Sequence, residues 1–167
     1  MDFLENALGV VVLVLCIASP QAKKKWQILL LSAVANFLSG INFLIFVGFT
    51  SAFVTNLLAV VQTATNIFKS IKNKDTGIIE KVIYLILYAA LSLSAYKTPI
   101  DLLVVLASLL FALAVFCKKE QHYRYFMLCN SAAYIVYDIL VGSTNLYSQI
   151  FAFISVTLAI IRYKNKE

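Results

Sequence analysis

Charged residues are scarce in this sequence. Only 13% of its 167 residues are Asp, Glu, Lys or Arg, about half the share that is usual in soluble domains. Hydrophobic residues account for 62%, and the mean hydropathy is +0.88. A soluble fold of this length cannot bury so much apolar surface. The composition therefore excludes a water-soluble globular protein and indicates that lipid surrounds much of the chain.

Residues that serve catalysis and metal binding are also few. The sequence has one histidine, His122, and three cysteines without paired spacing, Cys16, Cys117 and Cys129. These numbers predict no disulfide framework and no metal cluster. The sequence contains no Gly-rich phosphate loop and no Ser/His/Asp or Cys/His constellation. We therefore expect no catalytic residues, no metal and no cofactor, and an enzyme is the least favoured class.

Seven apolar runs follow one another with short polar breaks. They cover residues 4–20, 26–48, 50–68, 78–96, 99–117, 123–142 and 145–163. A helix of about 20 residues crosses a bilayer, and backbone groups in lipid must be hydrogen-bonded within the segment. The runs do not alternate in polarity as barrel strands do. The sequence thus predicts an all-α integral membrane protein with seven transmembrane helices.

The basic residues predict the orientation. If all seven runs cross, 13 of the 14 Lys and Arg residues fall on one side of the membrane and only Lys97 on the other. Because basic loops stay cytoplasmic, we expect the amino terminus outside and the carboxy terminus inside. Topology and anionic lipid headgroups explain the net charge of +6 without a nucleic-acid partner. The acidic start "MDFLEN" argues against a cleaved signal peptide.

The chain repeats itself after 94 residues. Residues 7–73 align without a gap to residues 101–167. Matched pairs include Asn36 with Asn130, Gly48 with Gly142, Thr50 with Thr144, and Thr63 with Thr157. Two three-helix units separated by one helix have the same orientation, as parallel repeats do. We predict a first bundle over residues 1–73, a linker helix over 74–98 and a second bundle over 99–167.

This 3+1+3 topology, together with Pro20-Gln21 in the segment "SPQAKKK", resembles the PQ-loop superfamily, which includes the SWEET and SemiSWEET sugar facilitators and the PnuC vitamin transporters. Size and repeat look most like the YgjV-type bacterial inner membrane proteins. The resemblance implies a role in solute passage or ligand reception. It also implies that Asn56 takes the place of a substrate-facing asparagine. The second unit has Ile150 at the matching position, and Ala114-Val115 in place of Pro20-Gln21.

The third run carries a polar stripe. Asn56, Gln62, Thr63 and Asn66 fall within about one third of the helix circumference. In a bilayer such side chains seek partners or water, because an unpaired polar group is costly. Two interpretations are open. The stripe lines a pathway for an uncharged polar solute, or it joins packed helices by hydrogen bonds.

The sixth run places four polar or aromatic side chains on one face. Asn130, Tyr134, Tyr137 and Asp138 lie at positions i, i+4, i+7 and i+8. A carboxylate within a bilayer is costly and usually faces the protein interior. Asp138 has three open interpretations: it binds a solute or a proton, it anchors a hydrogen-bond network, or it lies at the interface.

Together these features predict a transporter or facilitator of a small polar solute that is neutral or weakly charged, such as a sugar, nucleoside or vitamin. The pathway would run between the bundles. The predicted binding residues are Asn56, Gln62, Thr63, Asn66, Asn130, Tyr134, Tyr137 and Asp138. The alternative is a non-transporting membrane protein of the same fold that binds a ligand, lipid or partner. A monomer would contain both units and could suffice, which does not exclude a homo-oligomer.

Overall fold

The computed structural model describes residues 2–46, 48–49, 51–72, 74–142 and 146–164. Within these residues the chain forms seven α-helices and two short 3-10 helices, and no strand. The α-helices are α1 (Asp2–Ala18), α2 (Lys25–Phe46), α3 (Ser51–Ile71), α4 (Ile78–Ser94), α5 (Leu102–Phe116), α6 (Glu120–Val141) and α7 (Leu146–Tyr163). The 3-10 helices are η1 (Ser19–Gln21) and η2 (Pro99–Asp101). The prediction of an all-helical chain with seven helices is confirmed.

Among the described residues, three segments are long and apolar enough to cross a membrane: Lys25–Phe46, Pro99–Phe116 and Leu146–Tyr163. Helices α1 and α4 have 17 residues each, and Asn6–Gln21 is a shorter apolar helix. Helices α3 and α6 are longer but carry more polar side chains. Seven crossings therefore remain a prediction.

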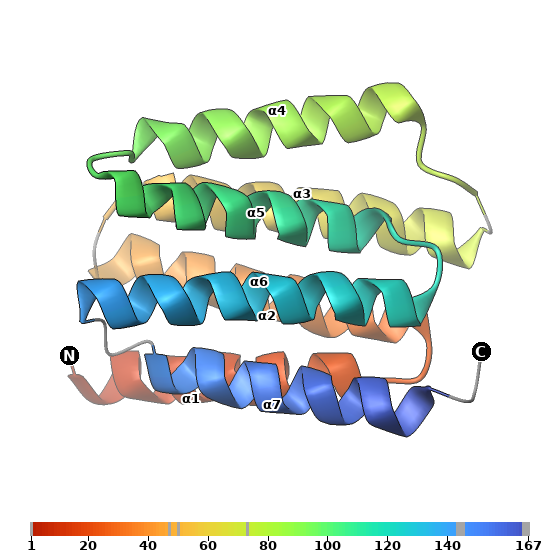
Figure 1. The fold of residues 1–167 in the computed structure, drawn as a ribbon, viewed down its shortest axis with the longest axis horizontal. Helices are drawn as coiled ribbons and strands as arrows, with labels where there is room; N and C mark the ends of the chain where they lie inside the picture. The colour runs from red at the N-terminus through yellow and green to blue at the C-terminus, as the bar shows by residue number, and fades with distance from the viewer. Residues whose placement is uncertain (1, 47, 50, 73, 143–145, 165–167) are drawn as a thin grey trace.

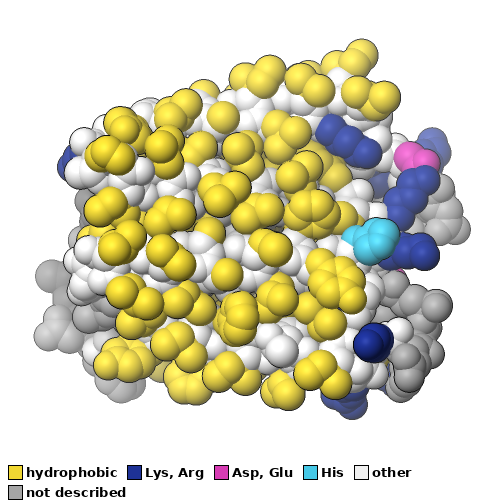
Figure 2. Space-filling model, in the orientation of Figure 1, with side chains coloured by type: hydrophobic (Ala, Val, Ile, Leu, Met, Phe, Trp, Pro, Cys, Tyr) yellow, Lys and Arg dark blue, Asp and Glu magenta, His cyan; other side chains and the backbone are white. Residues whose placement is uncertain are grey.

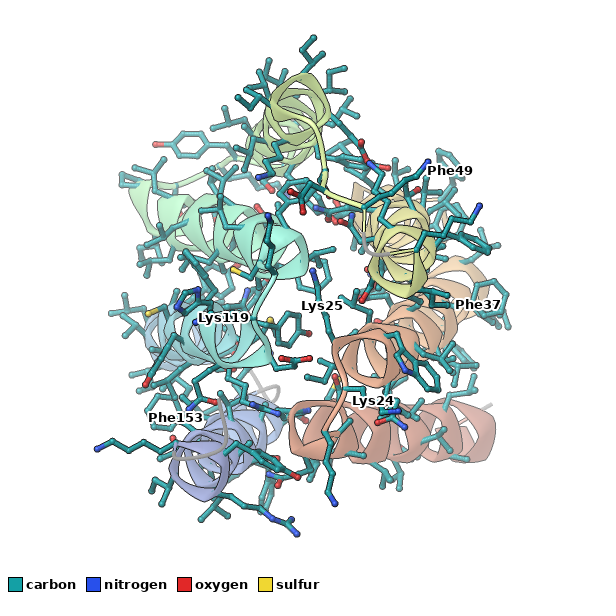
Figure 3. The ribbon with its side chains drawn as sticks, turned by 90° about the vertical axis from the view of Figure 1, so that its right-hand side faces the viewer. Lys24, Lys25, Phe37, Phe49, Lys119 and Phe153 are labelled. Carbon is teal, nitrogen blue, oxygen red and sulfur yellow. The ribbon has the colours of Figure 1, made fainter. Side chains whose placement is uncertain are left out.

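The seven helices form a closed ring. They lie side by side, with successive helices antiparallel and the two termini at opposite ends (Figure 1). Each helix packs on its neighbours in the chain. Helix α1 also packs on α7, and α3 on α5, so that α4 covers the outside of the α3–α5 contact. The end-on view of Figure 3 shows this ring around a central space into which side chains project.

Lysine and arginine side chains gather at one end of the ring, seen at the right of Figure 2. Helices α1, α3, α5 and α7 finish at this end, which we call the basic end (Figure 1). Hydrophobic side chains cover the middle of the face shown in Figure 2. This distribution suits a bundle whose middle lies in lipid and whose basic end lies in water.

Helices α2 and α6 are followed by the same kind of glycine. Helices α2 and α6 have 22 residues each, and each is followed by a glycine in the left-handed region, Gly48 with φ 93° and Gly142 with φ 70°. The Gly142 amide donates to the carbonyl of Asp138, which closes the end of α6. Only glycine adopts this conformation without strain. Gly48 and Gly142, which the 94-residue repeat matches in the sequence, thus also share a left-handed backbone conformation.

Candidate functional site

A cavity of about 490 Å³ lies at the centre of the ring. All seven helices contribute to its lining. The polar side chains along it are Ser19, Ser32, Asn36, Ser39, Asn42, Thr55, Asn56, Tyr88, Ser108, Tyr123, Asn130, Ser131, Tyr134, Ser148 and Gln149. Among the described residues, no Asp, Glu, Lys or Arg lines it. The cavity therefore offers hydroxyl and amide groups, which hydrogen-bond uncharged polar solutes.

The lining extends toward the end of the ring opposite to the basic end. Thr55 is in the second turn of α3, Ser148 is in the first turn of α7, and Asn42 is in the last two turns of α2. These three positions all lie close to the end at which α2 finishes and α3 and α7 begin. The cavity thus reaches from the centre of the ring toward the predicted outer side.

A layer of buried side chains closes the cavity toward the basic end. The Ser32 hydroxyl lies 2.8 Å from the Ser19 hydroxyl and 2.9 Å from the Tyr123 hydroxyl. Ser19 also donates to the carbonyl of Ile28. We call Ser19, Ser32 and Tyr123 the cavity floor. Tyr123 also belongs to an apolar cluster that is almost fully buried, with Ile28, Leu29, Ala114 and Val115. This tightly packed cluster lies on the basic-end side of the cavity.

Arg124 of α6 holds the segment that follows α1. Its side chain is 1% exposed. Its Nε donates to the carbonyl of Pro20 at 3.0 Å, and Nη2 donates to the carbonyl of Ala22 at 2.9 Å. Nη1 donates to Oε1 of Gln121. Helix ends leave carbonyls without intrahelical partners, and the planar guanidinium satisfies two of them at once.

Helix α7 completes this connection. The amide of Gln21 donates to the carbonyl of Ser155 at 2.7 Å, and the Ser155 hydroxyl donates to the carbonyl of Ile17 at 2.7 Å. The Tyr163 hydroxyl donates to the carbonyl of Gln21 at 2.9 Å, and its ring lies 4.4 Å below the Arg124 guanidinium. We call the set Gln21, Arg124, Ser155 and Tyr163 the clasp. It ties η1 to α6 and α7 at the basic end of the cavity.

Three of the eight predicted binding residues line the cavity: Asn56, Asn130 and Tyr134. The Asn56 side-chain amide donates to the Ala52 carbonyl of its own helix. Asn130 is 7% exposed and donates to the carbonyl of Ala107 in α5 at 2.7 Å. The structure thus brings one predicted residue of α3 together with two of α6.

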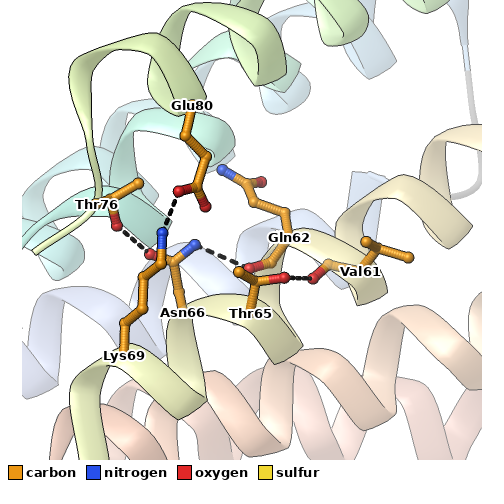
Figure 4. A network of polar contacts seen from close by, with 7 residues as sticks. All are labelled: Val61, Gln62, Thr65, Asn66, Lys69, Thr76 and Glu80. Atoms are coloured by element: carbon orange, nitrogen blue, oxygen red, sulfur yellow. Dashed lines mark hydrogen bonds and ion pairs between the residues drawn. The ribbon is translucent and has the colours of Figure 1, made fainter. Parts of the chain in front are cut away.

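The other three predicted residues of α3 lie elsewhere. Gln62, Thr63 and Asn66 are almost fully buried and do not line the cavity. The Gln62 amide donates to the carbonyl of Ala112 in α5. Figure 4 shows Asn66 donating to the Gln62 carbonyl and accepting a hydrogen bond from Thr76, next to the Lys69–Glu80 ion pair. For Gln62 and Asn66, these contacts match the interpretation as links between packed segments.

Tyr137 and Asp138 also lie outside the cavity lining. Asp138 is 4% exposed and lies close to both Tyr134 and Tyr137. Tyr137 additionally lies close to Asp101 of η2. Asp138 is therefore a buried residue in the last turn of α6, and all three interpretations of its role stay predictions.

Sequence reasoning missed the clasp and the cavity floor. It counted Arg124 only among the basic residues that set the orientation, although the side chain is buried. One signal was available: Pro20-Gln21 was singled out as a motif, and both residues lie in η1 at the clasp. The matching pair Ala114-Val115 lies in the apolar cluster. Both of these matched positions of the 94-residue repeat thus lie toward the basic end.

The chain belongs to the bacterial inner membrane protein family Imp-YgjV, whose family profile matches residues 3–167. No curated protein sequence and no solved structure gives a match.

Proposed function

We propose that this inner membrane protein is a transporter or facilitator that carries a small polar solute, neutral or weakly charged, through its central cavity. The observation that carries the proposal is the cavity itself: about 490 Å³, lined by hydroxyl, amide and apolar groups and by no charged side chain of the described residues. Ligand sites of small molecules commonly have volumes of about 300–1,000 Å³. Asn56, Asn130 and Tyr134 are the predicted residues that would contact the solute.

The proposal includes a topology. All seven helices cross the inner membrane, with the amino terminus outside and the basic end in the cytoplasm. The gathering of Lys and Arg at one end supports this orientation. Two parallel three-helix units, residues 1–73 and 99–167, would then flank the pathway with α4 as their linker. The contacts of α3 with α5 and of α1 with α7 are equivalent under the 94-residue repeat, which supports this arrangement.

In this account the structure is the state that opens outward, and the clasp is the cytoplasmic gate. Solute enters from the outer end and rests on the floor formed by Ser19, Ser32 and Tyr123. Release requires the hydrogen bonds from Arg124 and Tyr163 to the η1 segment to break. Movement of one unit against the other around a fixed site is the usual mode of such repeats.

The proposal is tested by the thermal stability of the purified protein in detergent with glucose, uridine, nicotinamide and thiamine. Binding to the native state raises stability by mass action. We expect one of these compounds to raise the melting temperature, and Asn56→Ala to reduce that rise. Asn66→Ala is the matched control, because Asn66 lies on the same helix outside the cavity. Absence of a shift with every compound contradicts solute binding and favours a lipid- or partner-binding protein.

A further inference from the structure

Helix α4 connects the two units, yet one of its side chains reaches the cavity. Tyr88 is 1% exposed and belongs to the cavity lining. It packs against Ala59 of α3 and Ala112 of α5, which are 3% and 0% exposed. Because both neighbours are alanines, the α3–α5 contact has room for a large ring from the helix behind it. The sequence predicted only a connecting role for this helix.

The hydroxyl of Tyr88 is buried and has no hydrogen-bond partner among the described residues. A buried hydroxyl without a partner costs about 1–3 kcal/mol, and buried tyrosines usually find a partner. Within the protein, the packing around Tyr88 is apolar, with Leu85 and Phe111 adjacent. The cavity is therefore the place from which a partner for this hydroxyl can come.

Aromatic rings surround this position. The Tyr88 and Phe111 rings lie 6.2 Å apart, edge to face, and Tyr134 lies close to Tyr88. All three side chains line the cavity. Flat apolar faces of this kind bind the faces of ring-shaped solutes, while the few polar groups around them fix the orientation.

We propose that Tyr88 is a solute-contacting residue: its hydroxyl hydrogen-bonds the solute, and its ring, with those of Phe111 and Tyr134, forms a subsite for a neutral, ring-shaped solute that carries hydroxyl or amide groups. The inference rests on the proposed function and narrows its solute class. It also makes α4 a wall of the site, so that the site has contributions from both units and from their linker.

The test compares Tyr88→Phe with Tyr84→Phe. Tyr88→Phe keeps the ring and removes the hydroxyl. Tyr84 lies one turn away on the same helix, packs against Phe116 at 5.9 Å and does not line the cavity. The probes are glucose, uridine and nicotinamide, with sorbitol as the open-chain counterpart of glucose, and the readouts are the melting temperature without ligand and the dissociation constant of each probe.

We expect Tyr88→Phe to weaken the binding of the best ring-shaped probe about tenfold, which is the effect of one lost hydrogen bond. Without ligand, its melting temperature is expected to equal or exceed that of the unaltered protein, because an unpaired buried hydroxyl is removed. Tyr84→Phe is expected to leave binding unchanged.

Three results would overturn the inference while leaving solute binding intact. They are unchanged binding by Tyr88→Phe, a loss of ligand-free stability in Tyr88→Phe that accounts for weaker binding, and binding of sorbitol as tightly as glucose. Failure of the unaltered protein to bind any probe contradicts the proposed function and this inference together.

Discussion

The guanidinium of Arg124 donates to the carbonyl of Pro20 at 3.0 Å, although the two residues are 104 positions apart. One belongs to the short 3-10 helix after α1, and the other to the first turns of α6. The same guanidinium also donates to the carbonyl of Ala22. A single buried side chain of α6 therefore connects that helix to the segment after α1 at the basic end.

Arg124→Lys is expected to destabilise the protein by about 1–3 kcal/mol. The planar guanidinium reaches two carbonyls, whereas a lysine ammonium in its place leaves at least one of these buried carbonyls unpaired. The melting temperature in detergent measures this effect. Arg162→Lys, at an exposed position of α7, provides the control and is expected to change stability little. Equal melting temperatures for the two variants would contradict the role of the clasp.

Asn66→Ala is expected to lower stability without affecting the cavity. The substitution removes the acceptor of the Thr76 hydroxyl at 2.8 Å, a loss of about 1 kcal/mol. Urea or thermal unfolding measures the change, and a labelled solute measures binding. A variant that binds solute more weakly while keeping its stability would place Asn66 in the pathway instead.

Gly142→Ala is expected to destabilise the protein by about 1 kcal/mol, because an alanine is strained at φ 70°. A Cβ at this position meets no atom within 4 Å, so backbone strain alone causes the loss. Gly9→Ala is the comparison. Its Cβ is equally free of contacts, and in a helix interior the change is expected to stabilise by about 0.5–1 kcal/mol. Thermal unfolding measures whether each variant is less or more stable than the unaltered protein. A stabilising Gly142→Ala would contradict the left-handed backbone conformation of Gly142 after α6.

Cys16 provides a native probe of water access, because it lines the cavity near the end of α1. In a variant with Cys117 and Cys129 replaced by alanine, we expect a water-soluble methanethiosulfonate to modify Cys16 from the outer side of membrane vesicles. A solute that binds in the cavity is expected to slow the reaction.

The reciprocal variant keeps only Cys129, which is exposed on α6 but does not line the cavity. Because that position faces lipid in the proposed topology, it is expected to stay unmodified. Reaction of Cys129 with no reaction of Cys16 would contradict a water-filled cavity.

Hydropathy and turn residues in the sequence predict the seven helices, since each apolar run ends at a polar break or at a glycine such as Gly48 or Gly142. The polar face of α3 was harder to interpret. Helical periodicity places Asn56 and Gln62 on one stripe, but α3 meets the cavity near Asn56 and meets α5 near Gln62. Periodicity specifies a face, and only the neighbouring helices decide what that face contacts.

The clasp was beyond sequence reasoning for a related reason. A lone arginine beside Lys118 and Lys119 has the composition of a cytoplasmic loop, and the orientation rule explains it fully. Its burial depends on carbonyls at Pro20 and Ala22, which reach it only once α1, α6 and α7 have packed. Apart from the Pro20-Gln21 motif, these long-range hydrogen bonds to helix ends leave no local pattern in the sequence.

Uptake into liposomes tests the central claim most directly. Purified protein is reconstituted, and entry of labelled glucose, uridine, nicotinamide and thiamine is measured beside protein-free liposomes and beside the Asn56→Ala and Asn130→Ala variants. The account predicts saturable uptake of at least one compound, with a clear loss in both variants. Folded protein that admits none of these compounds above the protein-free rate would contradict passage of a small polar solute through the cavity.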